Sequence, residues 1–356
     1  MKRINALIID PGITVREMLS DLLQQEEGIK VAGEMNGESG EEVKKTLREA
    51  LPDVILLGIN RIESRQMELL EMLRQEYTKL PVIVLTPHNR EGATIALTGL
   101  KWGAVEYINK TVSQIGSLHT REHFKQRLIP VIKAVNRLNR EVLTSKNGLG
   151  RLRDTGVPVV QFAKTPNQIE LVVFAGCLGG VPVLYQLLSS LPENLPVPAV
   201  IVQHMPKIYT EVFAEDLNRV SVLNVQEAKE DVTLKSGHVY VAPGGFQTIV
   251  RDRGGVHGFS LLRGPVVKGY RPSMDVLLQS IRNSFEDKVM VIYLSGGGQD
   301  GIEGAKVIDE LGGQIIIQNQ SSSLLWDLPW KIKGLGIHRG VYPLNRLGDE
   351  ITQRLI

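Results

Sequence analysis

The chain has 356 residues, a formal net charge of +2, scattered histidines and a single cysteine, and its length exceeds one ordinary domain and predicts two. This composition excludes a disulfide framework, a cysteine-rich metal site and the basic, aromatic surface of a nucleic-acid-binding protein. No apolar stretch reaches the length of a membrane span and no signal-peptide core follows Met1, so we expect a cytoplasmic protein without membrane insertion.

The first 144 residues alternate short apolar runs with stretches of helical period. This alternation is typical of an α/β fold with a doubly wound parallel sheet. An amphipathic stretch over residues 124–138 predicts a closing helix, in which Pro130 should cause a kink or mark a boundary. The predicted strands cover residues 6–9, 54–57, 82–85 and 105–108, and two of the helices cover 14–25 and 39–51.

Residues 145–166 show little periodicity and several Gly and Pro residues, which predicts an interdomain linker. A second α/β domain is predicted over residues 167–356. Within it, residues 247–262 have the pattern of a β-hairpin, so we expect a mixed, mostly parallel sheet. Its other predicted strands cover 171–175, 199–203, 239–242, 289–294 and 314–317, and its helices 182–190, 210–220, 273–285 and 302–311.

Cys177 lies in a glycine-rich turn between the strand at 171–175 and a predicted helix. The positive end of a helix macrodipole favours a thiolate, which is the form of cysteine that acts as a nucleophile. A cysteine is equally often a small buried hydrophobic residue, and the turn alone does not decide between these two interpretations.

His204 and Asp300 also follow predicted strands, so all three side chains are expected at one edge of a parallel sheet. A nucleophile, an imidazole that exchanges its proton and a carboxylate that orients the imidazole together favour acyl transfer. Glycine loops beside them supply backbone N–H groups for a developing oxyanion. Alternatively, His204 is a structural histidine and Asp300 is the N-cap of the helix that follows it.

A different interpretation comes from residues 296–301, which match the G-x-G-x-x-G pattern of a dinucleotide site. The strand after this motif ends in Gln318 and Asn319, without the acidic residue that would bind a ribose. Asp300 would also place a negative charge beside the pyrophosphate. Both observations argue against a dinucleotide, and we expect no cofactor.

Five motifs of the second domain resemble those of the CheB family, the two-domain chemotaxis response regulators with protein-glutamate methylesterase activity. The resemblance implies hydrolysis of methyl esters on glutamates of methyl-accepting chemoreceptors, and deamidation of certain receptor glutamines. It also implies that His204 is the general base and that Asp300 orients it. The motifs are Gly179-Gly180, VQHMP (202–206), GHVYVAPGG (237–245), RPSMDV (271–276) and Gln299-Asp300-Gly301.

Two positions of the second domain depart from the family pattern. The family places a serine at the position of Cys177, where a thiolate remains a competent acyl acceptor. The family places a methionine that helps to form the oxyanion site at the position of Gly297. The backbone N–H of Gly297 remains, but a glycine holds it less firmly. The resemblance assigns Gly179 and Gly180 to the nucleophile loop.

The first domain resembles a flavodoxin-like receiver domain that has lost its phosphoacceptor, because Gly58 stands at the acceptor position. Pro11 replaces one of two acidic residues, which leaves Asp10 alone to hold Mg²⁺. We therefore expect no metal. Thr86 and Lys110 keep the hydroxyl and ammonium positions, but an ordinary strand-end hydroxyl and a solvated lysine are the simpler interpretation.

Two functional hypotheses follow from these departures. In the first, the chain is an enzyme in which Cys177 attacks the glutamyl ester, His204 transfers protons and Asp300 orients His204. In the second, the chain is a catalytically degenerate relative that docks on chemoreceptors or on another signalling protein. Four departures, at Pro11, Gly58, Cys177 and Gly297, favour the second hypothesis.

Overall fold

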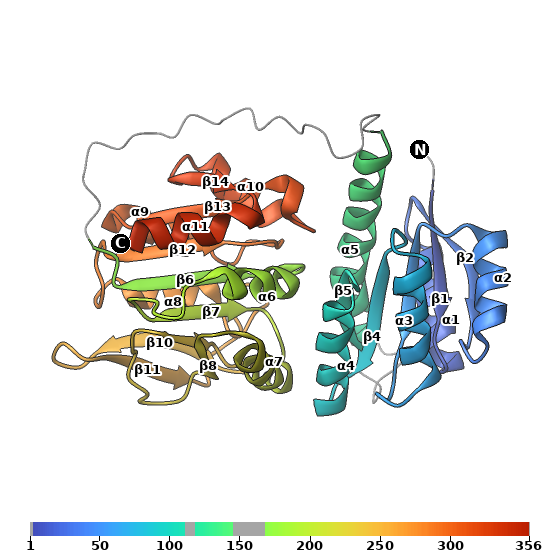
Figure 1. The fold of residues 1–356 in the computed structure, drawn as a ribbon, viewed down its shortest axis with the longest axis horizontal. Coiled ribbons are helices and arrows are strands. Elements are labelled where there is room, and N and C mark those ends of the chain that lie inside the picture. Colours follow the sequence, from blue (N-terminus) through green and yellow to red (C-terminus); the bar gives the residue numbers. More distant parts are fainter. Residues whose placement is uncertain (1–2, 111–117, 145–167, 356) are drawn as a thin grey trace. The chain divides into compact units, whose positions relative to one another are not determined.

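The computed structural model describes residues 3–110, 118–144 and 168–355. The chain divides into two compact units, residues 1–150 and 151–356, each with its own sheet (Figure 1). Both are α/β units, which confirms the predicted fold class. The predicted linker, residues 145–166, lies outside the described residues.

The N-terminal unit has a five-stranded parallel sheet in the order β2-β1-β3-β4-β5. Because the strand order reverses after β2, right-handed crossovers place α1 on one face of the sheet and α2, α3 and α4 on the other. The last helix, α5, contacts α1. The elements are β1 (Ile4–Ile9), α1 (Ile13–Gln24), β2 (Ile29–Met35), α2 (Gly40–Ala50), β3 (Val54–Gly58), α3 (Arg65–Glu76), β4 (Val82–Pro87), α4 (Arg90–Lys101), β5 (Glu106–Lys110) and α5 (Leu118–Thr144).

Helix α5 continues through Pro130 to Thr144, so the prediction that Pro130 marks a boundary is wrong. Proline costs a helix one backbone hydrogen bond, but buried apolar side chains on both sides of it hold this helix against the sheet. These are Phe124, Leu128, Val131, Ile132 and Val135.

The C-terminal unit has a seven-stranded sheet in the order β14-β13-β12-β6-β7-β9-β8, and every neighbouring pair is parallel. Its elements are β6 (Leu171–Gly176), α6 (Gly180–Ser190), β7 (Ala199–Gln203), α7 (Lys207–Val220), β8 (Asn224–Glu227), β9 (His238–Val241), β10 (Gln247–Asp252), β11 (His257–Leu262), α8 (Met274–Ile281), β12 (Val289–Tyr293), α9 (Ile302–Leu311), β13 (Gln314–Gln318), η2 (Gln320–Ser322), α10 (Asp327–Gly334), β14 (Gly340–Tyr342) and α11 (Leu344–Leu355).

The predicted mixed sheet is wrong, although the hairpin itself is confirmed. Strands β10 and β11 pair antiparallel in a separate two-stranded sheet. The loop between β8 and β9 pairs with the outer edge of β11, where Asp231 N–H donates to Phe259 O (3.0 Å) and Leu234 N–H donates to His257 O (2.9 Å). Strand β10 packs against α8. The hairpin therefore satisfies its backbone groups without joining the main sheet.

Strand β6 lies between β7 and β12 in the middle of the C-terminal sheet. All six of its residues are buried, as expected for a strand covered on both faces. Because the three strands are parallel, the loops that follow them meet at one edge of the sheet. These loops carry Cys177, His204 and Asp300.

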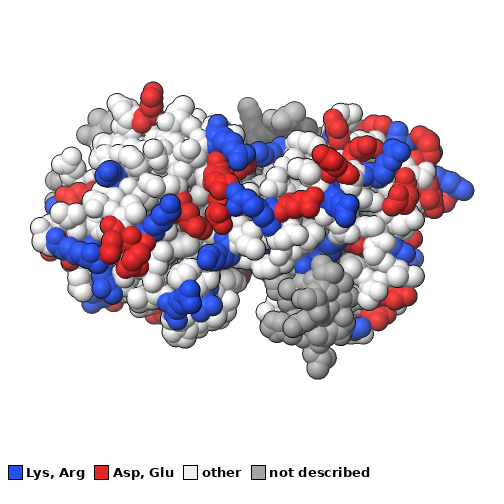
Figure 2. Space-filling model, turned by 90° about the horizontal axis from the view of Figure 1, so that it is seen from below, with Lys and Arg blue, Asp and Glu red and all other residues white. Residues whose placement is uncertain are grey.

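The surface carries charges of both signs. Figure 2 shows basic and acidic side chains interspersed over the face in view, consistent with the small net charge of +2. None of the helices in the described parts of the chain has the length and apolar character needed to span a bilayer.

Candidate active site

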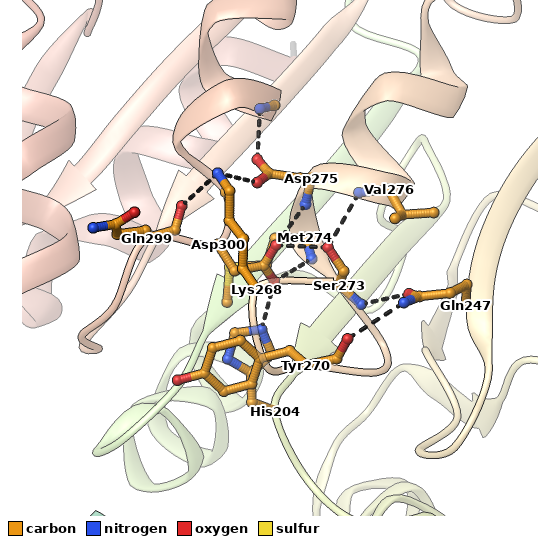
Figure 3. Close-up of polar contacts among 12 residues, drawn as sticks. His204, Gln247, Lys268, Tyr270, Ser273, Met274, Asp275, Val276, Gln299 and Asp300 are labelled. Carbon is orange, nitrogen blue, oxygen red and sulfur yellow. Dashed lines mark hydrogen bonds and ion pairs between the residues drawn. The ribbon is translucent and has the colours of Figure 1, made fainter. Parts of the chain in front are cut away.

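His204 and Asp300 form a hydrogen-bonded pair below the surface of the C-terminal unit (Figure 3). His204 Nε2 donates to Asp300 Oδ2 at 2.8 Å, and both side chains are almost fully buried. A buried charge is costly unless it is paired and hydrogen-bonded. The pair therefore fixes both the orientation of the imidazole and the nitrogen that carries its proton toward the carboxylate.

The Asp300 carboxylate is held by the N-terminus of α8. Its Oδ1 accepts hydrogen bonds from Ser273 Oγ (2.6 Å) and Asp275 N–H (3.2 Å), while Oδ2 accepts one from Met274 N–H (2.7 Å) (Figure 3). Burial acts to raise the pKa of Asp300, but the His204 hydrogen bond and charge, together with these donors, hold it below its usual value.

Asp300 does not cap the helix that follows it, because Gly301 is the N-cap of α9. The carboxylate serves a different helix, α8, which begins earlier in the chain. The alternative interpretation of Asp300 as an N-cap of the next helix is therefore wrong. Its partners lie in the RPSMDV motif, for which the sequence analysis assigned no role.

The backbone around Cys177 is held by two neighbouring loops. Cys177 N–H donates to Ser295 O (3.1 Å), and Gln203 Nε2 donates to Cys177 O (2.7 Å). A Cβ atom at Gly296 would lie 2.8 Å from Cys177 Cβ, so a larger residue there would displace the thiol-bearing loop. The thiol position is thus set by the strands on either side of β6.

Small residues in the same turn make room for Gln203. A Cβ atom at Gly176 or at Gly180 would overlap Gln203 Oε1. Gly179 adopts a left-handed conformation (φ 77°), and a Cβ atom there would approach Leu324 Cβ to 2.6 Å. The glycines of this turn therefore have packing reasons to be glycine.

Cys177 and His204 interact electrostatically. Burial of the His204 ring favours its neutral form, but the Cys177 thiolate and the Asp300 carboxylate outweigh burial and raise the pKa of His204 to about 9. Cys177 is also buried, with 4% of its surface exposed. The buried Cys177 thiol therefore lies close enough to the His204 ring to affect its pKa.

The candidate oxyanion donors differ in how they are engaged. Gly180 N–H donates to Cys177 O (3.0 Å) within the turn. Gly297 lies between two anchored amides, since Gly296 N–H donates to Leu325 O (2.8 Å) and Gly298 N–H donates to an Asp327 carboxylate oxygen (3.0 Å). These anchors fix the backbone at Gly297, although it lacks a side chain.

Tyr270 covers the His204 ring, a contact that the sequence analysis missed. The two rings stack with their centroids 3.6 Å apart and their planes at 11° (Figure 3). Lys268, in the same loop, forms an ion pair with Asp275 (2.8 Å) and donates to Gln299 O (3.1 Å). The loop is thereby tied to both elements that position Asp300.

The N-terminal unit places Asp10 and Lys110 in direct contact. Lys110 Nζ lies 2.9 Å from Asp10 Oδ2 and donates to Asn60 Oδ1 (2.6 Å), and 2% of the Lys110 side chain is exposed. Lys110 is therefore not the solvated lysine of the simpler interpretation. Burial lowers the pKa of Lys110 although Asp10 opposes that effect. Thr86 is buried at the end of β4.

The absence of a side chain at Gly58 allows this arrangement. A Cβ atom at Gly58 would overlap Asp10 Oδ2, so the Asp10 carboxylate fills the space of an acceptor side chain. Asp10 Oδ1 accepts a hydrogen bond from Gly12 N–H (2.8 Å). Both carboxylate oxygens of Asp10 are thus engaged, and the residues present do not fit Mg²⁺, which prefers several free oxygen ligands. No group of three His, Cys, Asp or Glu residues suited to a metal lies in the described ranges.

Both units match known protein families. Residues 172–351 match the family model of the CheB methylesterase, and residues 6–121 match the response regulator receiver domain. The chain belongs to the CheB methylesterase family. Among its CheB relatives is a protein-glutamate methylesterase/protein-glutamine glutaminase of Trichodesmium erythraeum, which is 32% identical over 355 residues with full coverage of both chains.

Two further CheB relatives support the assignment. A protein of the same name from Pyrococcus abyssi is 29% identical, and the match covers 99% of this chain and 94% of the Pyrococcus protein. The crystal structure of the Thermotoga maritima CheB methylesterase catalytic domain is 29% identical, with a TM-score of 0.51. That match covers 52% of this chain and 99% of the Thermotoga domain.

The interaction between Cys177 and His204 can be measured directly. Cys177→Ala removes the largest contribution that raises the pKa of His204, so we expect that pKa to fall below its value of about 9. NMR titration of the imidazole protons between about pH 5 and pH 10 measures the pKa in both proteins. An unchanged pKa would show that the thiol and the ring do not interact.

The N-terminal unit should not accept a phosphoryl group, because Gly58 offers no carboxylate and Asp10 is buried and paired. Incubation with acetyl phosphate should leave the intact mass of the chain unchanged in mass spectrometry. Stable addition of one phosphoryl group to a peptide from residues 1–144 would contradict this expectation.

Proposed function

We propose that this CheB-family chain is a protein-glutamate methylesterase that uses Cys177 in place of the serine expected for the family. The observation that carries the proposal is the His204–Asp300 hydrogen bond (2.8 Å) beside a thiol that interacts with the same ring. A nucleophile, a base and an orienting carboxylate in this order are the parts that acyl transfer requires.

In the first half of the reaction, the Cys177 thiolate attacks the ester carbonyl and forms a tetrahedral intermediate. Among the residues that the structure describes, no nitrogen or oxygen atom forms a hydrogen bond with His204 Nδ1. This nitrogen is therefore the one that exchanges protons near the thiol. The imidazolium gives its proton to the departing methoxide, methanol leaves, and a thioester remains on Cys177. Asp300 stabilises the imidazolium without itself being protonated.

In the second half, neutral His204 takes a proton from water, and the hydroxide adds to the thioester carbonyl. The intermediate collapses to glutamic acid and the Cys177 thiolate, with one proton of the water left on His204. The glutamic acid then releases the other proton of the water to solvent and becomes the carboxylate. The thiolate and imidazolium are thereby restored. Glutamine deamidation would follow the same course, with ammonia as the leaving group instead of methanol.

The substrate and setting follow from the family. We propose that the ester belongs to a methyl-accepting chemoreceptor or a similar signalling protein, and that the reaction takes place in the cytoplasm. Because Gly58 cannot be phosphorylated, activation would depend on a signal other than phosphoryl transfer to that position, such as binding of a protein partner.

A catalytically degenerate binding module is the second candidate function. It is favoured by the burial of Cys177 and by the ion pair between Asp10 and Lys110, which occupies the space of the acceptor. A protein that had stopped catalysing would be free to accumulate such changes. It would retain the fold for docking on a receptor or signalling partner.

Methanol release from a methylated receptor distinguishes the two candidates. For an enzyme, we expect release by the unchanged protein, and a loss of about 10³-fold or more in Cys177→Ala and in His204→Gln, because the triad acts as a unit. Gas chromatography of the released methanol measures the rate. Release no faster from the unchanged protein than from Cys177→Ala would eliminate the enzyme and leave the binding module.

A further inference from the structure

Two basic side chains lie over one aromatic ring in the C-terminal unit. Lys207 Nζ is 5.5 Å from the centroid of the Phe246 ring, and Arg263 Cζ is 5.7 Å from it. Both basic residues are exposed, and no carboxylate of the described residues forms an ion pair with either. Cation–π contacts orient both charges but do not neutralise them. The two positive charges of this cluster, which consists of Lys207, Phe246 and Arg263, can therefore bind an anion.

A nearby carboxylate does not fill this role. Glu227 interacts electrostatically with Lys207, but its Oε1 already accepts a hydrogen bond from Thr210 Oγ1 at 2.7 Å. Burial raises the pKa of Glu227, which makes it a poorer counter-ion than an exposed acid. The positive charge of Lys207 thus remains available to a ligand from outside.

The cluster is joined to the catalytic histidine through the start of α7. This helix begins at Lys207, three residues after His204. The loop that carries Phe246 packs directly on that start, because a Cβ atom at Gly244 would overlap Lys207 N. Gly244 N–H also donates a hydrogen bond to Thr210 Oγ1 (2.9 Å) in the first turn of α7.

A second connection passes through the loop that covers the imidazole. Gly245 N–H donates to Arg271 O (3.0 Å), and Gln247 Nε2 donates to Tyr270 O (3.3 Å). Tyr270 in turn stacks on His204. The aromatic ring and its two cations are therefore anchored to both segments that border the imidazole, on the same edge of the sheet as the proposed chemistry.

We propose that Lys207, Phe246 and Arg263 form a binding site for carboxylate side chains of the substrate protein, next to the glutamyl ester that reacts. This inference rests on the proposed function. A methyl ester is neutral and offers no charge for recognition, whereas each turnover converts an ester into a carboxylate. A substrate with more than one ester thus presents carboxylates beside those still to be hydrolysed, and an Arg and a Lys bind them as a fork and a point charge.

Two synthetic helical peptides test the proposal. Both carry a central γ-methyl glutamate, with glutamates on either side in one peptide and glutamines in the other. Binding is measured by fluorescence anisotropy to full-length Cys177→Ala, which cannot turn the ester over. Adding Lys207→Gln and Arg263→Gln should weaken binding of the glutamate peptide by roughly three- to tenfold, as expected for two exposed charge contacts, and leave the glutamine peptide unaffected.

A matched control removes two charges elsewhere. Arg219 lies in the last turn of α7 and Lys235 precedes β9, so both are at the opposite edge of the sheet. Arg219→Gln with Lys235→Gln should leave the preference for the glutamate peptide intact. Equal weakening by both pairs, or no weakening by the first pair, would overturn the proposal. If the unchanged protein releases no methanol but Cys177→Ala still prefers the glutamate peptide, and this preference depends on Lys207 and Arg263, the proposed function is overturned and this binding site is supported.

Discussion

The candidate active site depends on one buried carboxylate. Asp300 joins the loop after β12 to His204 after β7 and to the N-terminus of α8, and each of its oxygens accepts two hydrogen bonds. Four donors compensate for the loss of hydration that burial imposes on the charge. Replacing this carboxylate would leave the His204 ring and the α8 amides without their acceptor. The imidazole is therefore oriented before any substrate arrives, which is the condition for electrostatic catalysis.

A second buried ion pair has the opposite consequence. In the N-terminal unit, Asp10 and Lys110 form a buried ion pair. Because Gly58 has no side chain, the Asp10 carboxylate occupies the space that a phosphoacceptor side chain would fill. The same physical rule, that a buried charge needs a partner, thus preorganises one site and closes the other. The chain combines a receiver fold that has a glycine at position 58 and a CheB-type fold in which His204 and Asp300 are hydrogen-bonded.

Much of this structure could be predicted from the sequence. The strands of both central sheets are continuous apolar runs, because they are buried on both faces, and their boundaries were within a few residues of the observed ones. Three edge strands escaped prediction, because β2 and β8 are partly exposed and β14 has only three residues. The hairpin was predicted correctly, but its separation from the main sheet depends on long-range bonds from residues 231 and 234, which carry no local signal.

The part of the candidate active site that lies at the ends of strands could be predicted from the sequence. Cys177, His204 and Asp300 each follow a predicted strand, and parallel topology brings strand ends together. The partners of Asp300 were not predictable in the same way, because Ser273 and Met274 lie on a helix that approaches only in the folded chain. Stacking of Tyr270 on His204 likewise depends on a loop conformation that no periodicity encodes.

The central claim is that Cys177 forms a covalent acyl intermediate. Rapid acid quenching of the unchanged protein with a peptide bearing a γ-methyl glutamate, followed by intact and peptide mass spectrometry, tests it most directly. We predict an adduct on Cys177 with the mass of the peptide less one methanol, which hydroxylamine removes as expected for a thioester. Methanol release without such an adduct, or an adduct on another residue, would contradict it.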